Sequence, residues 1–290
     1  MLSLKSTAAF AALLALGAVA ASAAGHRRWR ARTAALHRAL AASRTPIRPT
    51  VFDPGELDGL PEPVQRYLRA TLRAGQPLIT GVRLWHRGRF NLSATGSTWR
   101  PFVSSQVVGT CRPGFGWDGR IRVAPGLHVF VHDAYVAGEG VLRAAVLGVV
   151  PLADQRGGAA LAEGELMRYL AEAAWYPTAL LPSQGLQWDD VDPDSARATL
   201  VDGATRVALV FRFGTDADGN TVISGVSAER RPRTVGGQVV ATPWNGRFWA
   251  HALHHGMRIP VQGEVAWQLA AGPLPYWRGT LSRIEYDFAS

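Results

Sequence analysis

The sequence predicts a mainly β protein of the α+β class. We expect a large curved antiparallel sheet or half-barrel with a few helices packed on it, plus an N-terminal transmembrane helix. Three observations lead to this prediction: apolar and polar residues alternate over roughly ten short segments bounded by turn residues, one strong helical pattern interrupts them, and an uncharged apolar run opens the chain. With 290 residues and 47% hydrophobic content, the chain is large enough to bury a full core.

The charge distribution favours a membrane over a nucleic acid as the partner. The net charge is +9, yet the first 50 residues hold eight basic residues and no acidic one, so the remainder is nearly neutral. A basic segment beside an apolar run is typical of a membrane surface, where arginine is attracted to anionic headgroups. Cys111 is the only cysteine, which excludes an intrachain disulfide and a cysteine-based zinc site.

The N-terminal region divides into an anchor and a connecting segment. Residues 6–24 carry no charge, and as a helix they would span roughly 28 Å, enough for a single crossing. We therefore assign residues 1–25 to a transmembrane anchor or uncleaved signal, although residues 21–23 (ASA) also resemble a signal-peptidase site. The basic residues that follow favour the cytoplasmic face, and a periplasmic or extracellular domain stays open. Residues 26–54 are expected to form a basic juxtamembrane helix and a proline-rich linker.

Residues 55–290 are expected to form a single β-rich domain. A short helix is predicted over residues 64–73, where proline precedes the first turn. Alternating patterns and tight turns then predict an antiparallel meander, with strands at residues 82–92 and 99–111, a hairpin over residues 115–137 and a strand at residues 141–151. Further strands are predicted at residues 197–201, 205–213, 221–231, 238–251, 258–269 and 276–288.

A central helix is predicted between these two sets of strands, over residues 161–175. Its apolar stripe consists of Leu166, Leu170, Ala173 and Ala174. An opposite stripe at helical spacing consists of Glu165, Arg168, Tyr169 and Glu172. Pro177 ends the helix, since the residue before a proline avoids the helical conformation.

Known catalytic and metal-binding patterns are missing from the sequence. The acidic runs at residues 189–194 and 216–220 lack the glycine and glutamate positions of a calcium loop and are expected to be turns. His251, His254 and His255 have no zinc-binding pattern around them and are assigned to a strand end or loop. No nucleophile elbow or phosphate-binding loop is present. We therefore predict no catalytic residue, no metal and no cofactor.

Polar residues set among aromatic ones are the candidate ligand-binding residues. They could be structural, as buried carboxylates paired with arginines, or they could line an apolar pocket with a few convergent polar groups. The full set is Trp117, Asp118, Asp133, Tyr135, Glu165, Arg168, Tyr169, Glu172, Trp175, Arg258, Glu264, Trp267, Tyr276, Trp277 and Arg278.

Several motifs together resemble an uncharacterised bacterial family, a domain of unknown function usually found with an N-terminal membrane segment. They are residues 60–68 (LPEPVQRYL), 114–118 (GFGWD), 164–182 (GELMRYLAEAAWYPTALLP), 258–267 (RIPVQGEVAW) and 275–279 (PYWRG). The resemblance covers about residues 60–288 and implies no known activity. More loosely, the strand–helix–strand order resembles the half-barrel of bacterial lipoprotein carriers, which bind acyl chains. That is a fold analogy only.

Three functions are compatible with the sequence. The first is a membrane-anchored, non-enzymatic domain that binds a lipid or other apolar molecule between sheet and helix. The second is a hydrolase-like enzyme that uses two carboxylates among Asp118, Asp133, Glu165 and Glu172 as acid and base. The third is a membrane-tethered scaffold that binds another protein through its exposed strand face.

Overall fold

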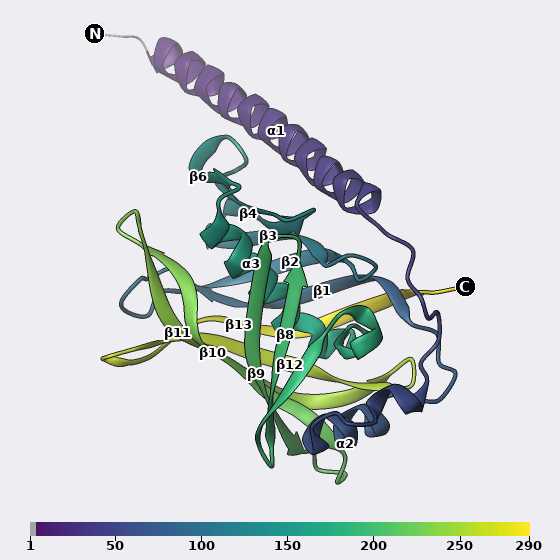
Figure 1. Ribbon diagram of the computed structural model, residues 1–290. Helices are drawn as coiled ribbons and strands as arrows, with labels where there is room; N and C mark the ends of the chain where they lie inside the picture. Colours follow the sequence, from purple (N-terminus) through teal and green to yellow (C-terminus); the bar gives the residue numbers. More distant parts are fainter. Residues whose placement is uncertain (1–3) are drawn as a thin grey trace.

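The computed structural model describes residues 4–290, and it describes side chains from residue 16 onward except that of residue 18. Residues 4–290 form three α-helices, four short 3-10 helices and one open sheet of thirteen antiparallel strands (Figure 1). The helices are α1 (Leu4–Ala42), η1 (Pro54–Leu57), α2 (Glu62–Thr71), α3 (Ala159–Glu172), η2 (Ala173–Trp175), η3 (Pro177–Leu180) and η4 (Pro182–Gln184).

The strands fall into two runs separated by α3. The first run is β1 (Ile79–Asn91), β2 (Trp99–Gly109), β3 (Gly114–Ala124), β4 (Leu127–Val136), β5 (Glu139–Val146) and β6 (Val150–Arg156). The second run is β7 (Gln187–Asp192), β8 (Ser195–Asp202), β9 (Thr205–Thr215), β10 (Thr221–Val235), β11 (Gln238–His254), β12 (Met257–Leu269) and β13 (Gly272–Phe288).

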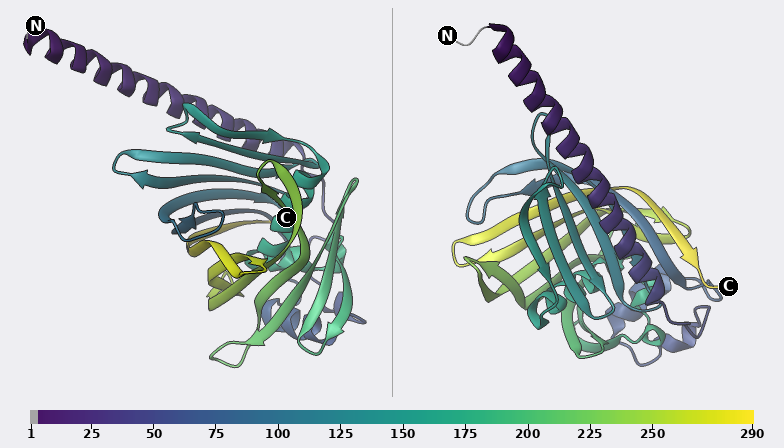
Figure 2. Two further views of the ribbon diagram at one scale, coloured as in Figure 1. Left: turned by 90° about the vertical axis from the view of Figure 1, so that its left-hand side faces the viewer. Right: turned by 90° about the horizontal axis from the view of Figure 1, so that it is seen from above.

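The chain enters the sheet at its centre and returns to the centre. The strand order is β6-β5-β4-β3-β2-β1-β13-β12-β11-β10-β9-β8-β7, so each run is a meander and the two runs meet where β1 pairs with β13. α3 and the 3-10 helices after it carry the chain from one edge strand, β6, to the other, β7. The predicted large antiparallel sheet is confirmed, and Figure 2 shows that it is curved.

Two predicted segments differ from the structure. Residues 141–151, predicted as one strand, are split between β5 and β6, because Leu147 and Gly148 adopt positive φ angles of 52° and 70° and reverse the chain. The acidic run at residues 189–194, predicted to be a turn, begins in the edge strand β7, and only its end turns. An edge strand tolerates such charges because its outer side faces water.

α1 lies along the outer face of the sheet, over β2, β3 and β4 (Figures 1 and 2). The structure has one continuous helix through the predicted membrane segment and the basic segment that follows it. Among residues whose side chains are described, no helix is both long and apolar enough to cross a membrane. The segment predicted to cross, residues 6–24, lies largely outside those residues.

The main core lies between the inner face of the sheet and the helices α2 and α3. α3 packs on β3, β4 and β5 from the first run and on β9 and β10 from the second. Its predicted apolar stripe is buried, and Leu166, Leu170 and Ala174 are each at most 1% exposed. Glu165 and Tyr169 from the predicted polar stripe are buried as well, so the polar side of α3 also faces the protein interior.

Candidate functional site

Side-chain alternation along β3 and β4 separates neighbouring residues onto the two faces of the sheet. Trp117 pairs with Asp133 across the two strands, and both line a cavity on the inner face. The next pair is Asp118 and His132, which lie on the outer face against α1. Adjacent residues in the sequence therefore belong to different surroundings.

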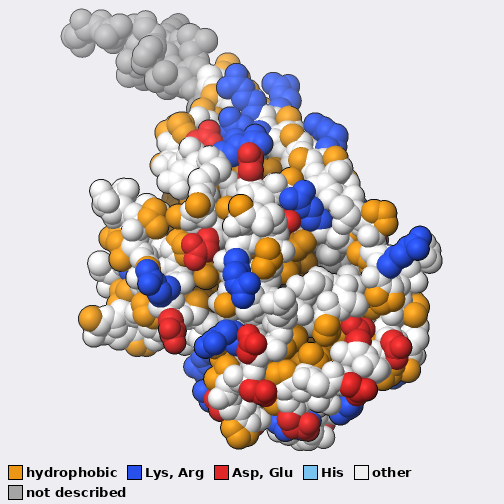
Figure 3. Space-filling model, in the orientation of Figure 1, with side chains coloured by type: hydrophobic (Ala, Val, Ile, Leu, Met, Phe, Trp, Pro, Cys, Tyr) orange, Lys and Arg blue, Asp and Glu red, His pale blue; other side chains and the backbone are white. Residues whose placement is uncertain are grey.

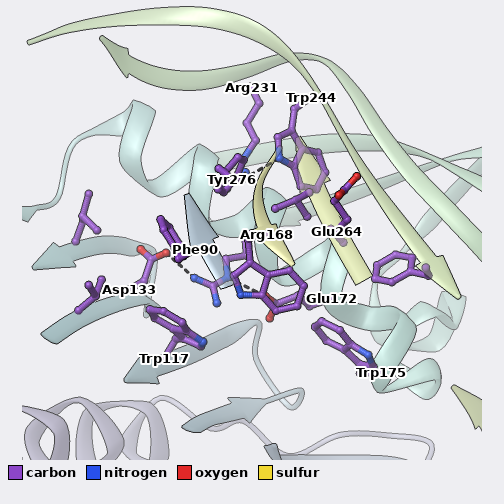
Figure 4. A pocket seen from close by; sticks show the side chains of 16 residues that line it. Phe90, Trp117, Asp133, Arg168, Glu172, Trp175, Arg231, Trp244, Glu264 and Tyr276 are labelled. Carbon is purple, nitrogen blue, oxygen red and sulfur yellow. Dashed lines mark hydrogen bonds and ion pairs between the residues drawn. The ribbon is translucent and has the colours of Figure 1, made fainter. Parts of the chain in front are cut away.

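An inner cavity of about 150 Å³ lies between the sheet and the C-terminal half of α3. Seven of its sixteen lining residues are aromatic, contributed by strands of both runs and by η2 (Figure 4). The aromatic residues are Phe90, Trp117, Trp175, Trp244, Phe248, Tyr276 and Trp277. The cavity is thus an apolar space with a few polar groups, as ligand sites commonly are.

Three of these tryptophans stand two positions before a glycine on the same strand face, in a W-x-G pattern. A Cβ added to Gly119 would lie 2.1 Å from the ring of Trp117, and one added to Gly279 would lie 2.2 Å from the ring of Trp277. At Gly246 the corresponding distance to Trp244 is 3.5 Å. The missing side chains let the indoles lie along the strand, which keeps the space above them open.

A wider outer cavity of about 950 Å³ adjoins the inner one. The two share Phe90, Asp133, Leu142, Arg231 and Tyr276 as lining residues. Exposed residues on its rim show that the outer cavity opens to solvent, and these include the apolar Leu92 and Val239, which are 44% and 57% exposed. The inner cavity therefore lies directly beside a cavity that is open to solvent.

Arg168 on α3 holds two carboxylates together at the inner cavity. Its Nη1 donates to Asp133 at 2.5 Å, and its Nε donates to Glu172 at 2.8 Å. Gln106 on β2 donates to the other oxygen of Glu172 at 2.5 Å, and the Arg168 guanidinium stacks over Trp117 at 5.2 Å. These contacts compensate the charges of Arg168, Asp133 and Glu172, so this part of the wall is a connected network in which Oδ1 of Asp133 has no hydrogen-bond partner among the described residues.

Glu165, one turn before Arg168, lies beside Asp133 at the outer cavity. Burial raises the pKa of Glu165 well above its ordinary value, and the negative charge of Asp133 raises it further. The nearby cations Arg168 and Arg231 act in the opposite direction and favour the ionised form. Nearby, burial and the positive charge of Arg168 lower the pKa of His86 to about 3, so this histidine, packed against Trp175, is neutral.

Arg231 on β10 lies where the two cavities meet. Its side chain is only 8% exposed and stacks over the rings of Trp244 at 4.9 Å and Trp267 at 5.5 Å. Its Nη1 donates to the hydroxyl of Tyr276 at 2.9 Å, and its Nη2 donates to the carbonyl of Gly164 at 3.1 Å. Arg231 thereby links β10 to β13 and to α3.

The profile of a protein family of unknown function, DUF6920, matches residues 58–286, which is most of the chain. The chain belongs to the DUF6920 family. A search among curated proteins found none that matches.

Two solved structures similar to this DUF6920 protein are distant from it. A LolA superfamily protein from Nitrosomonas europaea has 9% identity and a TM-score of 0.41, covering 77% of this chain and 91% of that chain. A beta-barrel-like protein of domain of unknown function DUF1849 from Brucella abortus has 13% identity and a TM-score of 0.29, covering 72% and 99%. Similarity at this level does not carry an argument about function.

The structure brings most of the predicted residues of this DUF6920 protein together. Those that line the inner cavity are Trp117, Asp133, Arg168, Glu172, Trp175, Glu264, Tyr276 and Trp277. Glu165 and Trp267 line the outer cavity. No group of three or more histidine, cysteine or acidic side chains suited to a metal ion occurs in the described part of the chain.

Five predicted residues line neither cavity, for reasons of local geometry. Asp118 faces α1, as described above. Tyr135 is fully buried and donates to Asp202 at 2.9 Å, and Tyr169 is 3% exposed within the core. Arg258 forms ion pairs with Asp216 and Asp218, residues of the turn between β9 and β10, at 3.0 and 3.2 Å. Arg278 is half-exposed, pairs with Glu264 and stacks over Trp99.

Four residues that line the cavity were not predicted from the sequence: Phe90, Arg231, Trp244 and Phe248. Trp244 carried a signal, because it begins the third W-x-G pattern, residues 244–246. The other three reach the cavity through the pairing of distant strands, which no local pattern encodes.

Proposed function

We propose that this protein binds an apolar or amphipathic small molecule, such as a lipid, in the inner cavity between the sheet and α3. The observation that carries this proposal is the aromatic lining of that cavity together with its position beside the solvent-open outer cavity. Burial of an apolar chain against such a lining contributes roughly 25 cal/mol for each Å² removed from water.

We also propose that the N-terminal part of α1 anchors the protein to a membrane. Residues 6–24 are uncharged and apolar, and arginines follow from residue 27. α1 is fixed to the outer face of the sheet through Trp29, so the inner cavity opens on the other face. A membrane anchor would place a lipid-binding domain close to its ligand. Expression of the full chain and fractionation with carbonate washing tests the anchor; recovery in the soluble fraction would contradict it.

Occupancy of the cavity can be tested by blocking it. Val131 on β4 lines the inner cavity, whereas Val103 on β2 is 57% exposed. Full-length wild type, Val131→Trp and Val103→Trp would be extracted under mild conditions and compared by native mass spectrometry. We expect a co-purifying lipid-sized mass in the wild type and in Val103→Trp, and its loss in Val131→Trp. Equal occupancy in both variants, or no bound mass in the wild type, would overturn the proposal.

A carboxylate-based enzyme is the second candidate, favoured by Glu165, a buried carboxyl beside Asp133 whose pKa is raised by burial and by the charge of Asp133. The other carboxylates are less suited to acid–base catalysis in the cavity, because Asp118 lies on the outer face and Asp133 and Glu172 are each bound to Arg168. Hydrolysis of nitrophenyl esters or glycosides by the wild type, abolished in Glu165→Gln and retained in Glu163→Gln, would support an enzyme. Equal rates in all three proteins would exclude this role for Glu165.

A further inference from the structure

Arg231 is a buried cation whose charge is not balanced by an ion pair. Within the described residues, no aspartate or glutamate oxygen forms a salt bridge with its guanidinium, and its Nε has no hydrogen-bond partner. An arginine cannot lose its proton in a protein, so this charge persists at every physiological pH. A buried charge in this state is costly unless another group, such as a ligand, compensates it.

Tyr276 supplies a second unused donor at the same place. Its hydroxyl oxygen accepts hydrogen bonds from Nη1 of Arg231 at 2.9 Å and from Nε1 of Trp244 at 3.0 Å. Two accepted bonds occupy both lone pairs of the oxygen, so the hydroxyl proton is left to donate. Across the part of the chain that is described, no acceptor for that proton is present. Both donors line the inner and outer cavities (Figure 4).

The carboxylates nearest to this junction do not satisfy Arg231. Asp133 is held by Arg168, and Glu165, although close enough for the charge of Arg231 to act on its pKa, forms no salt bridge with Arg231. The aromatic rings of Trp244 and Trp267 stabilise the cation only partly. Arg233, the next residue on the same face of β10, adds a second positive charge to the outer cavity.

We propose that Arg231 and Tyr276 bind the carboxylate of an anionic amphiphile, whose apolar chain occupies the aromatic inner cavity. A carboxylate offers two acceptor oxygens, one for an N–H of the guanidinium and one for the tyrosine hydroxyl, and hydrogen bonds to a charged acceptor are the stronger kind. The ligand would therefore be a single-chain carboxylic acid rather than a neutral lipid. This inference rests on the proposed ligand-binding function and specifies its ligand.

Photolabelling of the full-length protein in lipid nanodiscs tests the assignment. The probe is decanoic acid with a diazirine near its methyl end, and the corresponding alcohol is its neutral counterpart. The readout is the half-saturating probe concentration for labelling peptides that contain Trp117, Trp175 or Trp277. The variants are Arg231→Gln, which removes the charge, and Arg231→Lys, which retains it without the Nε donor. Arg247→Gln, an exposed residue of β11 outside both cavities, is the matched control.

We expect Arg231→Gln to raise the half-saturating concentration of the acid about tenfold, while that of the alcohol is unchanged. Arg231→Lys should also raise the half-saturating concentration of the acid, but by less than tenfold. Arg247→Gln should leave the half-saturating concentrations of both probes unchanged. If Arg231→Gln does not fold, the comparison of Arg231→Lys with the wild type tests the proposal. If both probes label the inner cavity and neither half-saturating concentration changes in the Arg231 variants, the proposed carboxylate contact is overturned. The proposed binding of an apolar molecule in the cavity would not be contradicted by that result. Absence of inner-cavity labelling by either probe would overturn both.

Discussion

The indole Nε1 of Trp29 donates a hydrogen bond to the carboxylate of Asp118 across 3.1 Å, and this contact fixes α1 to the outer face of the sheet. Trp29 is 1% exposed and stacks on His132, with 3.9 Å between the ring centroids. Trp29 forms a small second core together with Phe130 and Ala145. The Asp118 carboxylate, suggested as a ligand or catalytic group, has a structural role there.

Trp29→Ala should release α1 from the sheet. Truncation of a buried tryptophan costs about 3 kcal/mol or more, and here the loss falls on the docking of one helix. Hydrogen exchange over residues 26–42 should become faster while exchange in β10–β13 stays unchanged. Trp249→Ala is the control, because Trp249 is 40% exposed. Unchanged protection of α1 in the Trp29 variant would mean that the observed contact does not hold the helix.

Arg168→Met should destabilise the domain strongly. The substitution leaves Asp133 and Glu172 without their shared cation in a largely buried position, for which a cost of about 3–5 kcal/mol is expected. Arg143→Met removes an ion pair with the exposed Asp154 and should cost about 1 kcal/mol or less. Denaturant unfolding of the full-length variants gives both values. If the two variants lose similar amounts of unfolding free energy, the buried Arg168 ion pairs stabilise the domain no more than the exposed Arg143 ion pair does.

Glu165 should make stability depend on pH. Its pKa in the folded protein is raised above the ordinary value of 4.5, so its contribution is fully present below 4.5 and is lost as pH rises through the folded pKa. Glu165→Gln keeps a neutral side chain at all pH values. The free energy of unfolding of this variant relative to wild type should therefore increase between pH 5 and pH 8, as measured by urea unfolding. The difference in unfolding free energy between Glu163→Gln and the wild type should not change over this pH range.

Gly119→Ala should reduce the space in the inner cavity. The new methyl group would meet the ring of Trp117 at 2.1 Å, so the indole must rotate away from the strand. The backbone at residue 119 lies in an ordinary strand, and the substitution should cost little apart from this displacement. We expect a changed near-ultraviolet circular dichroism spectrum and loss of the co-purifying ligand. Gly96→Ala, in the turn between β1 and β2, is the control; equal ligand occupancy in both variants would count against the role of the W-x-G pattern.

The antiparallel meander was predictable because its signal is local. The alternation of apolar and polar residues that indicates a strand, and the residues that form a tight turn, both lie within short consecutive segments. The boundaries predicted for β2, β8 and β9 are therefore within a few residues of those observed. The chain reversal at Leu147 was missed because leucine rarely adopts a positive φ, so the apolar run containing it resembled one strand. An acidic edge strand such as β7 is equally hard to distinguish from a loop by composition.

The candidate site was only partly predictable. The sequence indicated polar residues set among aromatic ones as candidates. It did not indicate which of two neighbouring residues, such as Trp117 and Asp118, faces the inner side of the sheet. Arg231 was missed because its neighbours in the sequence are arginines and a proline, typical of an exposed strand end. Its burial depends on Tyr276 and Gly164, which are 45 and 67 residues away in the chain. Pairing between distant strands decides such positions.

The pairing of β1 with β13 has a consequence for how the protein is made. β13 is the last strand of the sheet to leave the ribosome, and it must pair with β1, which is the first. Until then no strand pairing joins the two halves of the sheet, and the inner cavity lacks the wall that carries Tyr276 and Trp277. Assembly of the sheet is therefore expected to finish after translation, as a slow step dominated by contacts between distant residues. An unfinished chain would expose the unpaired edges of β1 and β12, and such edges can pair with other chains and aggregate.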